Sequence, residues 1–292
     1  MSNSTDPLAP LTELPGVPEA VAGLRKAVDR LYGHRVMRRR SSEVSAESAL
    51  RGARASAALA GADWALEEVR RRSDFGAEAE ARTVGAALRV TGECGQLLEV
   101  WRHSPPSVLA RLHLVAAGGV APADTVGRPR LAGETVSDEG AEAAEATGAA
   151  SACDMSASGA EVALPDVDEV SARLDALARL ATGGTNVPAL VLAAVVHGEL
   201  MTLRPFGSYN GVVARAAERT VLVASGLDPK AVCPAEVGHA EGGVEAYARA
   251  LAGYRSGEPA GMATWIGHCG RAVELGVRES TAVCEAMQRG AA

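Results

Sequence analysis

Aromatic residues are scarce in this sequence, at 3% of its 292 residues, although 47% of the residues are hydrophobic. Leu, Val and Ala must therefore fill the core, and helices lined with Ala can pack closely. At this length the chain can form one large domain or two small ones. Either arrangement is long enough to bury a sizeable core.

The cysteines lack the pairing that a disulfide framework needs. They are odd in number, widely separated and without a C-x-x-C pair: Cys94, Cys153, Cys233, Cys269 and Cys284. This pattern argues against a disulfide scaffold and against a zinc-finger type of site. Four histidines also lack ligand-like spacing: His103, His113, His239 and His268. We read the adjacent pair His268-Cys269 as a weak signal and expect no metal site.

Long apolar runs are missing as well. Residues 1–18 are polar and rich in Pro, with no apolar signal core, and the longest apolar run, Val187 to Val196, is too short to span a bilayer. We therefore expect a cytoplasmic protein without a membrane partner. Lysine occurs only at Lys26 and Lys230, and abundant Arg, Ala and Gly are typical of a GC-rich, actinobacterial genome.

The negative charge is concentrated in one segment. Ten of the 36 acidic residues lie between Arg130 and Arg173, where no basic residue occurs, so the remaining 26 acids face 29 basic residues. Residues 132–164 are mostly Ala, Gly, Ser and acids, a composition that predicts a disordered insert. The remaining body is too weakly basic to indicate nucleic-acid binding. Four arginines keep that function as an alternative: Arg35, Arg38, Arg39 and Arg40.

Apolar residues recur at helical spacing through most of the chain, and no alternating strand pattern or internal repeat is present. We therefore predict an all-α bundle, with at most a short β-hairpin near residues 117–131. The expected organisation is listed by residue range: a disordered tail at 1–18, N-terminal helices and a flap at 19–131, the acidic insert at 132–164, core and closing helices at 165–277, and a C-terminal tail at 278–292.

The chain is organised around the stretch Arg204 to Arg215, which reads RPFGSYNGVVAR. An apolar helix is expected before it, at 187–203, and a second helix after it, at 212–225. A helix N-terminus that follows such a Gly-, Ser- and Asn-rich turn offers unpaired backbone N–H groups, which suit a phosphate or a carboxylate.

This stretch resembles the signature H-P-F-x-[DE]-G-N-G-R-x-x-R of the Fic (Fido) domain family. His197 in the preceding helix fits the same family, and the flap entry G-x-x-R of Fic domains is matched by Gly127, Arg128 and Arg130. The resemblance covers roughly residues 40–275 without the acidic insert. It implies a helical fold and, in active members, transfer of a nucleotide phosphate to a hydroxyl group of a target.

The resemblance also implies an impaired site. Arg204 stands at the position of the family's catalytic His, and an Arg cannot act as a base near neutral pH. Ser208 replaces the acidic residue that holds Mg²⁺, and a hydroxyl is a poor substitute for a carboxylate on a hard cation. Tyr209 replaces a Gly of the phosphate turn, and Val212 replaces the first phosphate-binding Arg.

Part of the signature remains. The positions that match the family, or that can still contact an anionic ligand, are Arg204, Phe206, Ser208, Asn210, Gly211 and Arg215. In family members with an N-terminal inhibitory helix, a Glu pairs with the last Arg of the signature. The similar segment here begins at Ser56 and ends at Gly61, with Ala60 where that Glu would stand. No confident catalytic residue emerges, and His197 is favoured as a buried structural residue over a replacement base.

Three functions follow from these observations. The favoured hypothesis is a Fic-like protein that has lost AMP transfer and acts as a binding or regulatory module for a protein partner or an anionic ligand. The main alternative is a divergent transferase of a nucleotide or another phosphate-containing group. Nucleic-acid binding is the third. No cofactor is expected under the first hypothesis, whereas a nucleotide with Mg²⁺ is expected under the second.

Overall fold

The computed structural model describes residues 6–76, 78–137 and 164–290, and no strand occurs within these ranges. The all-α prediction is therefore confirmed. The helices, with one 3₁₀ turn (η1), are α1 (Ala9–Thr12), α2 (Val17–Tyr32), η1 (Arg35–Arg38), α3 (Ser41–Leu59), α4 (Leu66–Arg71), α5 (Ala79–Cys94), α6 (Leu98–Trp101), α7 (Pro105–Ala117), α9 (Val167–Thr182), α10 (Ala189–Leu203), α11 (Asn210–Ala224), α12 (Ala235–Glu241), α13 (Val244–Ser256) and α14 (Pro259–Gln288).

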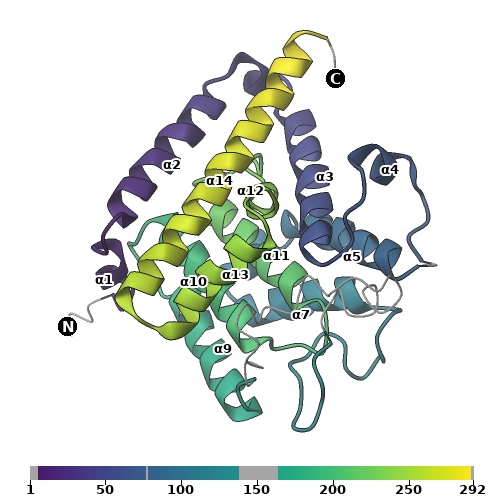
Figure 1. Cartoon of the computed structure of the whole chain (residues 1–292), viewed down its shortest axis with the longest axis vertical. Helices are drawn as coiled ribbons and strands as arrows, with labels where there is room; N and C mark the ends of the chain where they lie inside the picture. The colour runs from purple at the N-terminus through teal and green to yellow at the C-terminus, as the bar shows by residue number, and fades with distance from the viewer. Residues whose placement is uncertain (1–5, 77, 138–163, 291–292) are drawn as a thin grey trace.

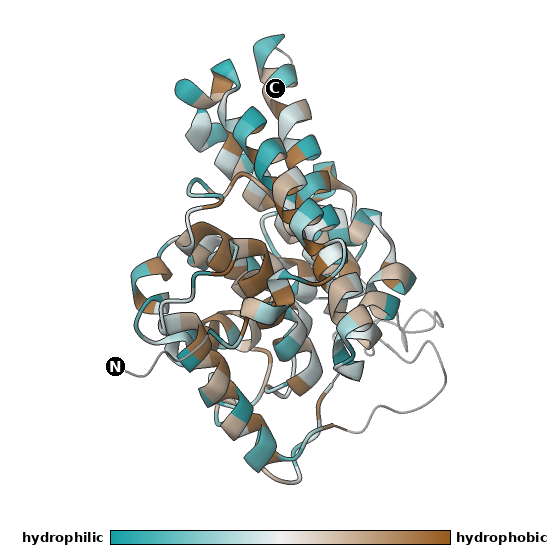
Figure 2. Cartoon of the chain, turned by 90° about the vertical axis from the view of Figure 1, so that its left-hand side faces the viewer, coloured by the Kyte–Doolittle hydropathy of each residue, from teal (hydrophilic) through white to brown (hydrophobic). Residues whose placement is uncertain are grey.

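The helices α10 and α11 form the centre of the molecule (Figure 1). Residues 210–223 of α11 are all buried, and α10 is buried along most of its length. A helix that is buried on every face has to be surrounded by other helices. The helices α3, α5, α7, α13 and α14 supply this cover, and Figure 2 shows hydrophobic colours concentrated in the body of the molecule.

The long helix α14 crosses the front of the molecule and packs on α2, α10, α12 and α13 (Figure 1). Its approach to α12 is very close. A Cβ atom on Gly238 of α12 would lie 2.0 Å from the carbonyl oxygen of Ala272 in α14, so no larger residue fits there without a shift of the backbone. This contact fixes the position of α12 against α14.

Both predicted tails are corrected where the structure describes them. Residues 6–18 contain α1 and the start of α2, and Leu8 and Val17 are buried. At the other end, α14 runs 11 residues beyond 277 because its apolar face continues through Val283 and Met287, which are buried. The seven-residue α12 was not predicted, because it is too short to show a helical period.

The predicted hairpin is absent, since residues 118–137 are irregular. Two backbone hydrogen bonds nevertheless join this segment to the loop between α10 and α11. The N–H of Arg130 donates to the carbonyl of Pro205 at 2.7 Å, and the N–H of Ser137 donates to that of Gly207 at 2.8 Å. Most of the predicted acidic insert, residues 138–163, lies outside the described residues. Among the described helices, none is long and apolar enough to cross a membrane.

Candidate functional site

The loop between α10 and α11 holds two non-glycine residues in left-handed conformation. Arg204 has a φ of 43° and ends α10, and Tyr209 has a φ of 55° and precedes α11. Each such residue costs on the order of 1–2 kcal/mol. The loop is held in this shape by its own side chain Asn210, whose Oδ1 accepts from the Phe206 N–H at 2.9 Å and whose Nδ2 donates to the Phe206 carbonyl at 2.8 Å.

Phe206 anchors the loop to α7. Its ring stacks on the imidazole of His113, with the ring centroids 4.3 Å apart and 18° between the planes. The Nδ1 atom of His113 accepts a hydrogen bond from the Gly127 N–H at 3.0 Å, so the same histidine also fixes the beginning of the flap. Burial lowers the pKa of His113 to about 4 and keeps its ring neutral.

The flap residues hold the loop from the other side. Arg130 is buried, and its Nε donates to the Arg204 carbonyl at 3.2 Å while its guanidinium also contacts the Pro165 carbonyl. Arg128 forms an ion pair with Glu134 at 2.6 Å. Arg130 thus ties the flap to the loop, whereas Arg128 joins residues within the flap.

The last arginine of the signature, Arg215, is directed away from the loop. Its side chain is buried, its Nε donates to the Ser56 hydroxyl at 2.9 Å, and its Nη2 donates to the Ser56 carbonyl at the same distance. The structure therefore brings Ser56, the first residue of the segment 56–61 at the end of α3, next to Arg215. Ala60, which is also buried, offers no carboxylate. An inhibitory origin of this segment stays a prediction.

A cavity of about 480 Å³ lies where the loop meets the flap and α5. Its lining includes the polar residues Arg82, Thr83, His113, Thr125, Glu134, Thr135, Ser137 and Ser208. The ring of Tyr209 also borders this cavity and is itself buried. Val212, by contrast, is 2% exposed inside α11, so an apolar side chain fills the place that the resemblance assigns to a phosphate ligand.

His197 lies in the interior and does not line this cavity. Its Nε2 is 2.6 Å from the Tyr247 hydroxyl, and its Nδ1 is 2.8 Å from Oε2 of Glu218. Burial lowers the pKa of His197 even though Glu218 opposes this effect. His197 is the buried structural histidine that the sequence favours and cannot serve as a base at the loop.

Sequence reasoning missed the residues that the flap and α5 bring to the loop, Arg82 and Thr135 among them. They lie 69 or more positions before the signature, so no spacing marks them. It also missed the environment of Glu218. A carboxylate within the apolar run of α11 is a signal that could have been followed, because buried acids need partners.

The sequence matches no protein-family model, and it matches no curated protein. The structure, however, is similar to solved Fic structures. A Fic family protein from Desulfovibrio desulfuricans has a TM-score of 0.69 and 20% identity, over 90% of this chain and 74% of that one. Fic-1 from C. elegans has a TM-score of 0.63 and 13% identity, over 92% of this chain and 73% of the solved chain.

A Fic domain containing signaling protein from Bacteroides thetaiotaomicron has a TM-score of 0.58 and 11% identity, over 91% of this chain and 98% of that protein. Identities of this size support the fold and leave the activity open. The agreement covers at least 90% of this chain in each case. The chain therefore has the Fic (Fido) fold.

Proposed function

We propose that this protein is a Fic-fold protein that has lost AMP transfer and acts as a binding or regulatory module. The observation that carries the proposal is Arg204 at the position of the catalytic His, because a guanidinium stays protonated near neutral pH and cannot accept a proton from a target hydroxyl. His113 does touch the loop, but its ring stacks on Phe206 and its Nδ1 accepts a hydrogen bond from the Gly127 N–H.

The phosphate side of the site supports the same proposal. Arg215 bonds to Ser56 in the interior, Asn210 bonds to the backbone of Phe206, and Val212 is apolar. Ser208 provides no carboxylate for Mg²⁺. A bound nucleotide would need these groups to leave the bonds that now hold the loop and α3 in place.

The cavity beside the loop is the binding site that we assign to this module. Its volume of about 480 Å³ is in the range of small-molecule sites. The lining mixes hydroxyl groups with the charges of Arg82 and Glu134, so a small polar or anionic ligand fits it better than an apolar one. If the partner is a protein, a segment of it would insert one polar or acidic side chain into this cavity.

A divergent transferase is the second candidate. It would use the loop, Asn210 and Arg215 with another base, and it requires Arg215 to exchange Ser56 for a phosphate. Nucleic-acid binding is the third, supported by the exposed side chains of Arg35, Arg38 and Arg39 around η1. A steep loss of RNA affinity with salt would favour it.

The test combines labelling with binding. The protein is incubated with ATP, GTP or CDP-choline and Mg²⁺, its intact mass is measured, and a binding isotherm is recorded for each nucleotide. We expect no mass increase. Self-labelling by the wild-type protein that is abolished in Arg215→Ala would overturn the proposal and establish the transferase.

The cavity assignment has its own control. Nucleotide or phosphate binding should weaken in Arg82→Ala and stay unchanged in Arg111→Ala, because Arg111 is an exposed arginine that pairs with Glu93 away from the cavity. Equal binding by both variants would place the ligand elsewhere.

A further inference from the structure

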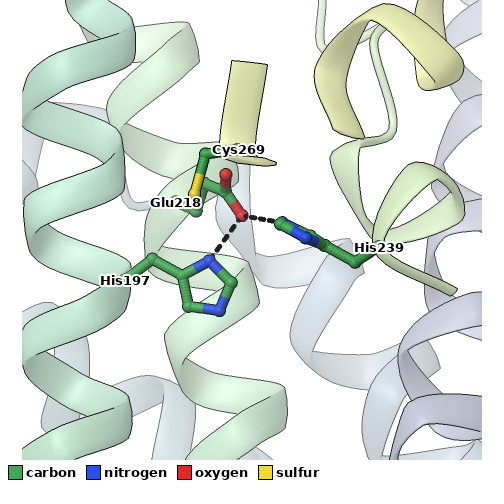
Figure 3. A group of neighbouring side chains, drawn as sticks. All are labelled: His197, Glu218, His239 and Cys269. Atoms are coloured by element: carbon green, nitrogen blue, oxygen red, sulfur yellow. Dashed lines mark hydrogen bonds and ion pairs between the residues drawn. The ribbon is translucent and has the colours of Figure 1, made fainter. Parts of the chain in front are cut away.

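Four side chains with metal-ligating atoms meet in the interior, away from the loop (Figure 3). They come from four helices: His197 from α10, Glu218 from α11, His239 from α12 and Cys269 from α14. All four are 0% exposed. One ligand atom from each lies within 4.8 Å of the others, and no comparable group occurs elsewhere in the described ranges.

The centre of this group is Oε2 of Glu218. It lies 2.8 Å from Nδ1 of His197 and 2.9 Å from Nε2 of His239, as the dashed lines in Figure 3 show. The contact with His197 lacks the alignment of a hydrogen bond, so His197 Nδ1 has no hydrogen-bond partner. The second carboxylate oxygen, Oε1 of Glu218, has none either.

Unpartnered polar atoms in a dry interior are expensive, and a carboxylate is the most expensive of them. Here two such atoms belong to neighbouring side chains of one cluster. A positive ion between them would satisfy both, whereas in the described chain Oε1 of Glu218 has no hydrogen-bond partner and Nδ1 of His197 has only its 2.8 Å ion-pair contact with Oε2. The arrangement thus points to a ligand that the protein chain does not itself provide.

The outer nitrogens of both histidines already have partners. Nε2 of His197 lies 2.6 Å from the Tyr247 hydroxyl, and Nδ1 of His239 lies 3.1 Å from Nε2 of His268. With protons on these outer nitrogens, the lone pairs of His197 Nδ1 and His239 Nε2 face Glu218. Metal-bound histidines are held in this way, by a hydrogen bond from the nitrogen that does not bind the metal.

We propose that His197, Glu218, His239 and Cys269 bind one Zn²⁺ ion as a buried structural site. Two imidazole nitrogens, a carboxylate oxygen and a thiolate sulfur are ligands that zinc accepts, and four of them complete a tetrahedral shell. The Glu218 carboxylate and the Cys269 thiolate together balance the charge of the ion. With every position filled and no access for solvent, the site has no place for a substrate.

The distances allow this assignment with small movements. Zinc bonds to nitrogen and oxygen of about 2.0–2.1 Å place tetrahedral ligand atoms about 3.3 Å apart, so the two N···O distances would open by about 0.5 Å. Cys269 is a free, buried thiol, and α12 is held against its helix by the close approach at Gly238. The ion would tie α10, α11, α12 and α14 together.

The competing arrangement contains no metal. In it the charge of Glu218 is balanced by a proton on a histidine, with the guanidinium of Arg215 close enough to interact with His197. The two arrangements differ in what Cys269 does. It is a thiolate ligand in the first and a spectator thiol in the second, and this difference can be measured.

The experiment uses the full chain. Metal content is measured after purification, zinc is then removed with a chelator, and Co²⁺ is added in its place. We expect one zinc per chain and, with Co²⁺, the visible bands of a tetrahedral site together with an ultraviolet thiolate-to-cobalt charge-transfer band. Cys269→Ser should lose the charge-transfer band, and Cys284→Ser, a buried cysteine of the same helix, should keep it.

Two further measurements test the proposal even if Cys269→Ser fails to fold. For the wild-type protein, removal of the metal should lower the Tm and added Zn²⁺ should restore it. Tyr247→Phe removes an outer partner and should weaken zinc binding about 10-fold. A wild-type chain that binds no zinc and gives no cobalt spectrum would overturn the proposal, and so would an unchanged charge-transfer band in folded Cys269→Ser.

Discussion

The start of α11 and its middle offer a contrast. At the start of α11 lies the loop that carries the family signature, and there Asn210 and Arg215 are bound to other parts of the chain. In the middle lies Glu218, where sequence analysis expected nothing and polar atoms lack partners. A signature marks a loop by its sequence, whereas buried polar groups without hydrogen-bond partners mark a place where we propose a ligand. The predictions below test this contrast, beginning with the largest effect.

Glu218→Ala should be the most damaging single change. It removes the carboxylate that contacts both His197 and His239, and breaking a buried charged network costs about 3–5 kcal/mol. Urea unfolding measures the loss in free energy of unfolding. Glu245→Ala, at an exposed helical position, is the control and should change it by less than about 0.5 kcal/mol. Similar losses of unfolding free energy in both variants would show that the cluster around Glu218 does not stabilise the fold.

Phe206→Ala tests the loop. The ring is 2% exposed and stacks on His113, so its removal leaves a cavity and should cost about 3 kcal/mol. Because Phe206 is not one of the four proposed zinc ligands and stacks on His113, the same variant should leave the zinc content unchanged. If the variant lost both the stacking and the zinc, the loop and the proposed zinc site would be structurally coupled.

Asn210→Ala should cost about 2 kcal/mol, since it leaves the buried N–H and carbonyl of Phe206 without partners. Asn210→Asp keeps the acceptor and should lose less. Thermal and urea unfolding compare the two variants. An equal loss in both would mean that the donated bond of Asn210 is the one that matters.

The change in the free energy of unfolding with pH is the smallest effect when it is taken over one pH unit. The pKa of His113 is about 4 in the folded protein, below the ordinary value of 6.5, so between these values the unfolded chain binds more protons. The stabilisation is fully present above pH 6.5 and falls by about 1.4 kcal/mol for each unit as the pH drops toward 4. In His113→Gln this part of the slope should vanish. An unchanged slope would show that His113 titrates normally.

The sequence predicted the elements whose signal lies within a short stretch of the chain, such as a helical period of apolar residues or a contiguous signature. The apolar periods around α9, α10 and α11 located these helices, and the signature located the loop between α10 and α11. It could not show that Arg215 bonds to Ser56, 159 positions away, or that the flap would reach the loop without a hairpin. Nor could it show the group around Glu218, because its four members lie at least 20 positions apart and become neighbours only through helix packing.

The helix α14 has a consequence for the order in which the chain can be assembled. The helix α2 packs chiefly against α14, which lies more than 200 residues later, so its apolar face with Leu24, Val28 and Leu31 has no partner while most of the chain is being synthesised. Domains generally form as their N-terminal parts leave the ribosome. In this protein α2 can pack only after α14 has been synthesised. A nascent chain that stops before residue 259 therefore exposes the apolar face of α2 to chaperones and proteases.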